Sequence, residues 1–367
     1  FGLSYQPSGR IGGITLALNI KGNPKSFTFD QMSGKVGELN FGGIGSVDLS
    51  GLRPKITADI NVSALDLNPF LPTARKVGLA PKLWGKLKLH PVVWPGPKPE
   101  DHQRSITQIA NKGFWSNNLF DVSILKVLDA DIAFRSPLLT MSNYLFKKID
   151  FMFEIKNGTL ITKRLKARMF GGQLQGDTKI IVGKTNQITS TFKILGIKIS
   201  DALASINRKV TANGLLDVNL DFTASGKSVA GLVGSLNGTG GFIMKGVDVS
   251  AGVKGSAFSG VYNLLTSLNQ IGHIRSRNQT DVNATFKIVK GVAKTNDLKL
   301  TSLLGDGVAT GTVDLVGWLL NMKGQIQLEQ NALTQILQAK FKHSASPVGF
   351  TLTGPLDAPD VKVDTKA

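Results

Sequence analysis

The sequence predicts a mainly β protein, built as one elongated antiparallel sheet with a few short helices. Three observations support this fold class: a block that recurs along the chain, segments in which apolar and polar residues alternate, and a composition of 41 glycines and 14 prolines in 367 residues. Such a composition is typical of many short strands joined by tight turns. The length alone suggests two or three domains, but the repeat favours one continuous body of modular sections.

A long block occurs three times, and its copies align when Gly51, Gly183 and Gly317 are placed in register, at separations of 132 and 134 residues. The apolar positions at matching offsets are Ile56, Ile188 and Met322; Ile60, Phe192 and Ile326; Val62, Ile194 and Leu328; Leu67, Ile199 and Leu333; and Leu71, Leu203 and Leu337. The early positions recur with period two, which is typical of a strand, and the last two lie four residues apart, which indicates a helical turn. A repeat of this kind sets the architecture of the whole chain.

A second block is an alternating strand that ends at a glycine, and its copies end at Gly22, Gly226 and Gly354. The apolar residues before these glycines are Ile14, Leu16, Leu18 and Ile20; Val218, Leu220, Phe222 and Ala224; and Val348, Phe350 and Leu352. Because glycine adopts positive φ at little cost, we expect each to turn the chain. The second block follows the first by 43 and 37 residues in two copies, so we expect the chain to be a fragment that begins inside a repeat.

Two further segments, Phe151–Ile155 and Val282–Ile288, place apolar side chains on one face and polar side chains on the other, as in half-solvated antiparallel sheets. We expect short helices at Asp201–Arg208, Phe258–Gln270 and Asn331–Lys340.

The stretch at 91–103 is expected to be a proline-rich loop or linker, since four prolines lie within its first ten residues. We therefore divide the chain into a partial first repeat section at 1–90, a second section at 104–212 and a third at 213–367, all parts of one β body.

The formal charge of +18, from 43 basic and 25 acidic residues, favours anionic partners such as acidic lipid head groups or nucleic acid. The lysines are nevertheless spread over the polar faces of strands, which is equally expected of a solvated surface. Aromatic residues are not interleaved with basic ones as nucleic-acid platforms require, so no nucleic-acid partner is expected. No apolar run is long enough to cross a bilayer as a helix.

Chemistry-bearing motifs are missing from the sequence. There is no cysteine, and the four histidines have no metal-ligand spacing. Asp129 and Asp131 would share the polar face of a strand, where solvation explains them. We therefore expect no enzyme activity, no cofactor and no metal site.

Five segments, in order, resemble the AsmA-like family: Ile56–Leu71, Trp115–Phe134, Asn157–Gly176, Leu236–Val249 and Gly349–Asp364. The resemblance covers nearly the whole chain. It implies a relation to the larger bacterial proteins TamB and YhdP, and a long curved antiparallel sheet, a taco-like β-groove with an apolar trough. It also implies a Gram-negative periplasmic protein that is anchored to the inner membrane by an N-terminal helix, which this chain lacks.

The function that the resemblance implies is phospholipid transport from the inner toward the outer membrane, in support of outer-membrane biogenesis. An acyl chain exposed to water costs roughly 0.8 kcal/mol per CH₂, and an apolar strand face can cover it without catalysis. The residues that we expect to line the trough are Ile56, Ile60, Val62, Phe151, Phe153, Ile188, Phe192, Phe222, Val282, Phe286 and Ile288.

Three alternatives remain open at this point. In a closed sandwich or barrel, the same apolar faces would be ordinary core. The protein could instead be a structural or assembly factor for outer-membrane proteins, recruiting client strands at its sheet edges without carrying lipid. The proline-rich stretch also stands where a strand block is expected, which leaves the continuity of the trough undecided.

Overall fold

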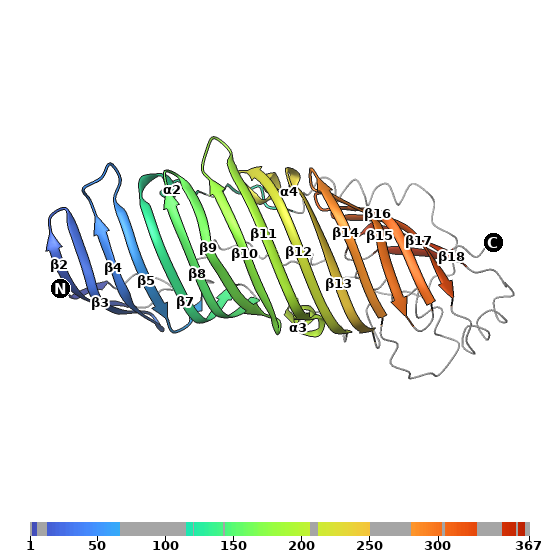
Figure 1. The fold of residues 1–367 in the computed structure, drawn as a ribbon, viewed down its shortest axis with the longest axis horizontal. Coiled ribbons are helices and arrows are strands. Elements are labelled where there is room, and N and C mark those ends of the chain that lie inside the picture. The colour runs from blue at the N-terminus through green and yellow to red at the C-terminus, as the bar shows by residue number, and fades with distance from the viewer. Residues whose placement is uncertain are drawn as a thin grey trace, which may run out of the picture.

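The structure, a computed structural model, describes most of the chain as one continuous sheet. The described residues are 2–5, 13–66, 115–119, 121–141, 144–205, 212–249, 280–302, 305–328, 347–356 and 359–363. They form a 19-stranded sheet whose strands lie side by side in chain order along the long axis of the molecule (Figure 1). The sheet is open, with β1 and β19 as the edges of its described part. At a spacing of about 4.8 Å, its strands extend over roughly 90 Å.

The described residues form 19 strands and three short helices. The strands are β1 (Gly2–Tyr5), β2 (Ile14–Asn23), β3 (Ser26–Val36), β4 (Leu39–Asp48), β5 (Lys55–Val62), β6 (Leu65–Asp66), β7 (Asp129–Met141), β8 (Tyr144–Lys156), β9 (Thr159–Met169), β10 (Gly172–Ile181), β11 (Asn186–Lys198), β12 (Ala212–Gly226), β13 (Asn237–Val249), β14 (Thr280–Val289), β15 (Val292–Ser302), β16 (Gly305–Asp314), β17 (Leu319–Leu328), β18 (Val348–Pro355) and β19 (Asp360–Val363). The helices are α2 (Ile124–Val127), α3 (Ile199–Ser205) and α4 (Val229–Gly234). The prediction of a mainly β, elongated antiparallel fold is confirmed.

The long repeat corresponds to equivalent elements of the sheet. Gly51, Gly183 and Gly317 each lie in the turn before a strand, and the strands that follow are β5, β11 and β17. The closing helical turn of the repeat is confirmed in the middle copy, where Ile199 and Leu203 lie in α3. This helix begins two residues before the helix predicted at Asp201–Arg208. Outside the described residues lie the closing positions of the other copies, the two other predicted helices and the stretch at 91–103.

The strands of the second block are also confirmed, as β2, β12 and β18, but one of its glycines acts differently from the prediction. Gly22 and Gly354 adopt positive φ, at 151° and 101°, whereas Gly226 does not. A Cβ at Gly226 would lie 2.7 Å from the backbone nitrogen of Leu232 in α4. Glycine is therefore needed there for the close approach of a helix and not for a turn.

β-Bulges interrupt the register of many strand pairs and bend the sheet. In β11 and β13 the bulge contains a glycine with positive φ, Gly196 at 67° and Gly246 at 60°. Each glycine N–H donates a 2.7 Å hydrogen bond to an aspartate of the next strand, Asp217 and Asp281 respectively. Because a bulge bends its strand and increases the local twist, this recurring arrangement contributes to the curvature of the sheet.

The sheet continues directly from β5 to β7, so the segment between them does not interrupt it. β5 pairs with β7 in parallel from Lys55 opposite Asp129 to Asn61 opposite Arg135, and the two residues of β6 extend the same parallel pairing. All other strand pairs of the described sheet are antiparallel. The sheet therefore has no break between β5 and β7, although the proline-rich stretch lies between them in sequence. The parallel pairing of β5 and β6 with β7 is here called the parallel seam.

Residues 115–119, here called the rim segment, lie far along the sheet from the strands that precede and follow them. The indole Nε1 of Trp115 donates a 2.6 Å hydrogen bond to the carbonyl of Leu315, and its ring meets that of Trp318 edge-on at 5.8 Å. The further backbone pairs are Ser116 with Ala230 and Leu119 with Ser228. The chain then returns to α2, where Leu125 packs on β7 and β8. The rim segment thus contacts both the β16–β17 turn and α4 with its preceding residue Ser228.

Candidate functional site

One face of the sheet, here called the apolar face, presents apolar or small side chains from β2 to β18. Directly opposed residues form two overlapping rows across the strands. The first row is Gly22, Phe27, Val47, Ile56, Ala130, Ile155, Leu160, Ile180, Ile188 and Ala224. The second row is Ser190, Phe222, Gly238, Ile288, Ala293, Val313, Leu320 and Gly354. The apolar face is therefore continuous across the parallel seam and along almost the whole sheet.

All eleven predicted lining residues lie on this face, on β5, β8, β11, β12 and β14. Val62 and Ile288 are buried, at 7% and 4% exposure, and the other nine are half-buried. Since the sheet is open, the alternative in which these residues form the core of a closed sandwich or barrel is wrong for the described strands. Their contact with lipid stays a prediction.

Burial of the apolar face increases toward the C-terminal strands. On β16–β18 a packed cluster contains Ala309, Leu320, Met322, Ile326, Phe350 and Leu352, all buried. On β2 to β4 the same face is at most half-buried. The apolar surface that a ligand could reach therefore lies mainly in the N-terminal and central parts of the described sheet.

Four phenylalanine rings on the apolar face lie across glycines of the neighbouring strand. The pairs are Phe41 with Gly34, Phe192 with Gly176, Phe286 with Gly240, and Phe350 with Gly324. A Cβ at Gly176 or Gly240 would stand 2.6 Å from the ring, so a larger residue would displace it. Aromatic rings over strand glycines restore packing that glycine itself lacks. Phe192 and Phe286 are among the predicted lining residues, and Phe350 lies in a predicted strand, but the Phe–Gly pairs were not predicted because they depend on strand register.

A short ladder of hydroxyl groups lies within the apolar face at β9–β11, beside the first row of apolar residues. Thr162 accepts a 2.6 Å hydrogen bond from the backbone N–H of Thr178, whose own hydroxyl lies 2.6 Å from that of Ser190. Ser190 in turn donates to the carbonyl of Asp177 at 3.0 Å. Buried hydroxyls that are hydrogen-bonded in this way need no ligand, so we assign the ladder a structural role.

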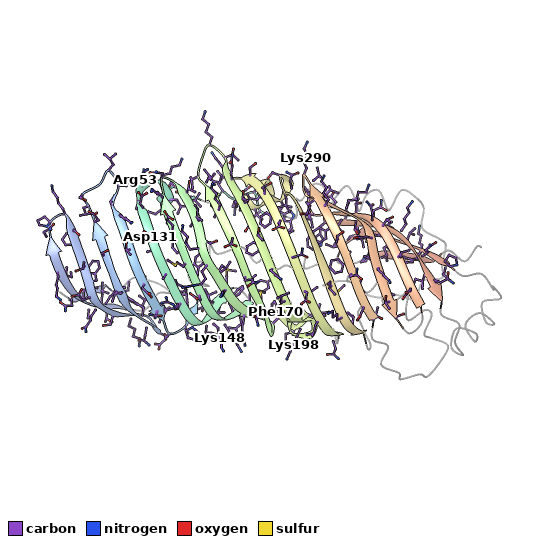
Figure 2. All side chains as sticks on the ribbon, viewed as in Figure 1. Arg53, Asp131, Lys148, Phe170, Lys198 and Lys290 are labelled. Atoms are coloured by element: carbon purple, nitrogen blue, oxygen red, sulfur yellow. The ribbon has the colours of Figure 1, made fainter. Side chains whose placement is uncertain are left out.

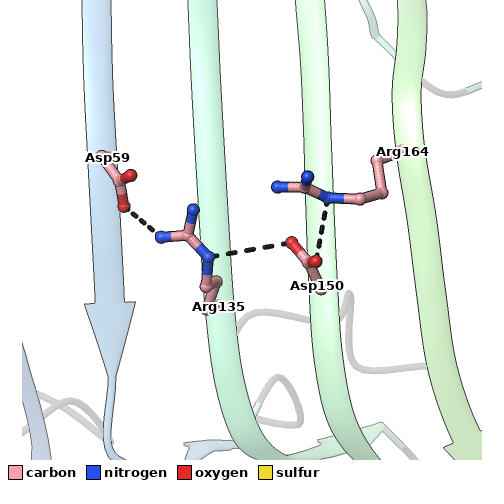
Figure 3. Close-up of polar contacts among 4 residues, drawn as sticks. All are labelled: Asp59, Arg135, Asp150 and Arg164. Carbon is pink, nitrogen blue, oxygen red and sulfur yellow. Dashed lines mark hydrogen bonds and ion pairs between the residues drawn. The ribbon is translucent and has the colours of Figure 1, made fainter.

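The opposite face is polar, and ion pairs cross the parallel seam on it (Figure 3). Arg135 of β7 bonds Asp59 of β5 at 2.5 Å and lies 3.8 Å from Asp150 of β8, which also pairs with Arg164 of β9 at 2.8 Å. The hydrogen bond from Arg135 to Asp59 raises the pKa of Arg135. These side chains are about one-third to two-fifths exposed. These ion pairs link β5, β7, β8 and β9 at the parallel seam. They lie on the face opposite the apolar face.

Asp129 and Asp131, predicted to share the polar face of a strand, lie on this second face as well. Asp129 and Asp131 pair with Arg53 and Lys55, at 3.5 and 3.0 Å, which accounts for two carboxylates in close sequence. They are structural ion-pair partners of the sheet.

Comparison with known protein families gives one match. A family model described as the AsmA family matches residues 12–298, well over half of the chain. The chain belongs to the AsmA family. Neither the curated proteins nor the solved structures contain a match to it. Membership of the AsmA family is consistent with a role in outer-membrane biogenesis or lipid transport, and the family is generally associated with the cell envelope. None of the helices described in this AsmA-family chain has the length and apolar character to cross a membrane.

Proposed function

We propose that this AsmA-family protein binds phospholipid acyl chains on its apolar face and carries them between the inner and outer membranes. The observation that carries the proposal is the continuity of the apolar face on an open sheet, with nine of the eleven lining candidates only half-buried. Covering a half-buried apolar surface of this length with acyl chains removes it from water, which is favourable.

The shape of the sheet suits a lipid whose two ends have opposite preferences. Each CH₂ removed from water contributes roughly 0.8 kcal/mol, while a charged head group is stable only when it stays hydrated. An open sheet covers the acyl chain on its apolar face and leaves the head group at the strand ends. No bond is made or broken, so the proposal assigns no catalytic residue and no cofactor.

The place of action in this proposal is the periplasm, with attachment to the inner membrane. The partners are phospholipids and the two membranes, with outer-membrane assembly proteins as further candidates and no nucleic acid. The family match and its envelope association support this placement.

The test is native mass spectrometry of the purified chain, followed by solvent extraction and lipid analysis. Phe192→Asp and Phe286→Asp place a carboxylate on the apolar face, and Leu195→Asp and Val289→Asp place one on the exposed polar face of the same strands. We expect phospholipid to copurify with the parent chain and both controls, and to be lost from the apolar-face variants while circular dichroism shows intact β structure. A folded parent chain without lipid, or equal lipid in all variants, would contradict the proposal.

A second candidate function, assembly of outer-membrane proteins without lipid carriage, rests on the two edges of the open sheet. Within the described part of the sheet, β19 pairs only with β18, so its other side offers backbone groups for a client strand. A photo-crosslinker at the exposed Lys362 of β19 should then capture β-barrel clients, and the purified chain should contain no lipid.

A further inference from the structure

A group of basic and apolar side chains gathers at one long edge of the sheet, where β8, β9 and β11 meet their turns. This basic edge patch contains Leu145, Lys147, Lys148, Arg168, Phe170 and Lys198. Figure 2 shows Lys148, Phe170 and Lys198 along the same edge, opposite the edge that holds Arg53 and Lys290. Its four cations are exposed, and Leu145 is 41% exposed. The patch is separate from the apolar face.

The cations of the patch lack ion-pair partners within the described residues. Lys147 and Arg168 are directly opposed across β8 and β9, an arrangement that repulsion makes unfavourable. Two carboxylates on neighbouring strands have other partners: Asp150 pairs with Arg164, and Asp217 accepts a hydrogen bond from the Gly196 N–H. An anion placed against Lys147 and Arg168 would relieve their repulsion.

Phe170 occupies a backbone conformation that is unfavourable for its side chain. It is the first residue of a two-residue hairpin loop, with φ of 47°, followed by Gly171 at 79°. The matching loops at the opposite edge begin with Asn157 and Lys290. Asparagine suits the left-handed region, whereas an aromatic residue is disfavoured there, so backbone preference does not account for phenylalanine at this position.

Contacts of Phe170 place it among the cations. Its ring meets Tyr144 edge-on at 6.3 Å, and its carbonyl accepts the N–H of Lys198 at 2.9 Å. The stem of Lys198 lies over Gly171, within 3.3 Å of the position of a Cβ there. On the next strand, the exposed Leu215 is directly opposite Lys198. Aromatic rings, exposed leucines and unpaired cations therefore share one edge.

We infer that the basic edge patch is a docking surface for a membrane whose lipids carry acidic head groups. Lysine and arginine near such a surface are attracted to its negative potential, and tyrosine and phenylalanine settle at the boundary between head groups and acyl chains. An acidic protein segment would satisfy the cations but gives no reason for the exposed leucines and the strained phenylalanine. The inference goes beyond lipid binding on the apolar face and does not depend on it.

The test is vesicle flotation of the full chain, using phosphatidylcholine vesicles with and without phosphatidylglycerol. We expect binding only to the vesicles that contain phosphatidylglycerol, weakened by added salt. Reversing Lys147, Lys148, Arg168 and Lys198 to glutamate should weaken it at least about tenfold. The control reverses Lys179, Lys193, Lys287 and Lys323, exposed lysines on the polar face, and should bind far more tightly than the patch variant.

A second variant separates docking from folding. Phe170→Asn removes the ring but introduces a residue that suits the left-handed backbone, so thermal stability should be kept while vesicle binding falls several-fold. Equal flotation of the patch variants and the parent chain would overturn the inference, as would an equal loss in the lysine control. Binding to soluble polyglutamate but not to vesicles would assign the patch to an acidic protein instead. The lipid content of the patch variants, measured by mass spectrometry, reports on the apolar face separately.

Discussion

The ring of Phe192 lies across the backbone of Gly176 on the neighbouring strand, so that a Cβ at Gly176 would meet ring atom Cδ1 at 2.6 Å. The same relationship recurs in three further Phe–Gly pairs along the apolar face. Because each ring fills the space above a glycine, it adds apolar area to the sheet and lies close to it. The packing of the phenylalanine rings on the apolar face therefore depends on the glycines beneath them.

Gly176→Ala should destabilise the protein and disturb the apolar face. The added methyl group would lie 2.5 Å from the backbone carbonyl oxygen of Thr191 and 2.6 Å from the Phe192 ring. Overpacking of this kind costs typically about 1–3 kcal/mol of the free energy of unfolding. The measurement is urea denaturation followed by circular dichroism. Gly234→Ala is the matched control, since a Cβ at that position in α4 meets nothing within 4 Å. Equal stability of the two variants would show that the Phe192 ring and the backbone at Thr191 adjust without cost.

Trp115→Ala should release the rim segment from the β16–β17 turn. The variant loses the indole hydrogen bond to Leu315 and the ring contact with Trp318, and we expect a loss of about 1–3 kcal/mol in stability. Trp115→Phe keeps an aromatic ring and removes only the donor, so its loss should be closer to about 1 kcal/mol. Hydrogen exchange at the Ser116–Ala230 backbone pair reports release directly. Unchanged protection of Ala230 in Trp115→Ala would contradict this role.

Asp217→Ala should weaken the bulge in β11. Without its carboxylate, the N–H of Gly196 loses its acceptor, and an unsatisfied backbone donor costs about 1–3 kcal/mol. Asp217→Asn retains an acceptor oxygen and should be less destabilised, which urea titration of both variants can test. If the two substitutions cost the same, the negative charge and not the hydrogen bond supports the bulge.

Acid should remove a small stabilising contribution from Asp297. Hydrogen bonds from the hydroxyl and the backbone N–H of Thr285 lower the pKa of Asp297 below its ordinary value of 3.8. The unfolded chain therefore binds this proton at higher pH than the folded chain does. Stability from the group is complete only well above the ordinary pKa, from about pH 5, and is lost as the pH falls through the lower, folded pKa.

Thermal melts between neutral pH and pH 3 can check this dependence, with Asp297→Asn flattening the acid limb slightly. Thr285→Val removes the hydroxyl donor but keeps the backbone N–H, so its effect should be intermediate. The effect is small, because Asp297 is exposed and solvent screens it. An acid limb that is steeper in Asp297→Asn than in the parent chain would contradict the assigned sign.

Local chemistry made much of the fold predictable. Alternating residues identify β2, β8, β12, β14 and β18. Within each strand they separate the apolar side chains from the polar ones, because successive side chains of a strand point to opposite sides. Recurrence of Gly51, Gly183 and Gly317 identifies equivalent turns before β5, β11 and β17. α2 and α4 were not predicted, since each is only one or two turns long and carries too few residues for a periodic signal.

The sequence by itself determined that this is a β protein with one apolar and one polar face, since that property belongs to each strand separately. Only the tertiary structure decided that β5 joins β7 in parallel, that Trp115 meets a turn 200 residues away, and that Phe192 covers Gly176. It likewise brought Lys147 opposite Arg168 beside the hairpin of Phe170. These relationships depend on which strands become neighbours and in what register, and pairing between distant segments leaves no periodic pattern in the residues that make it.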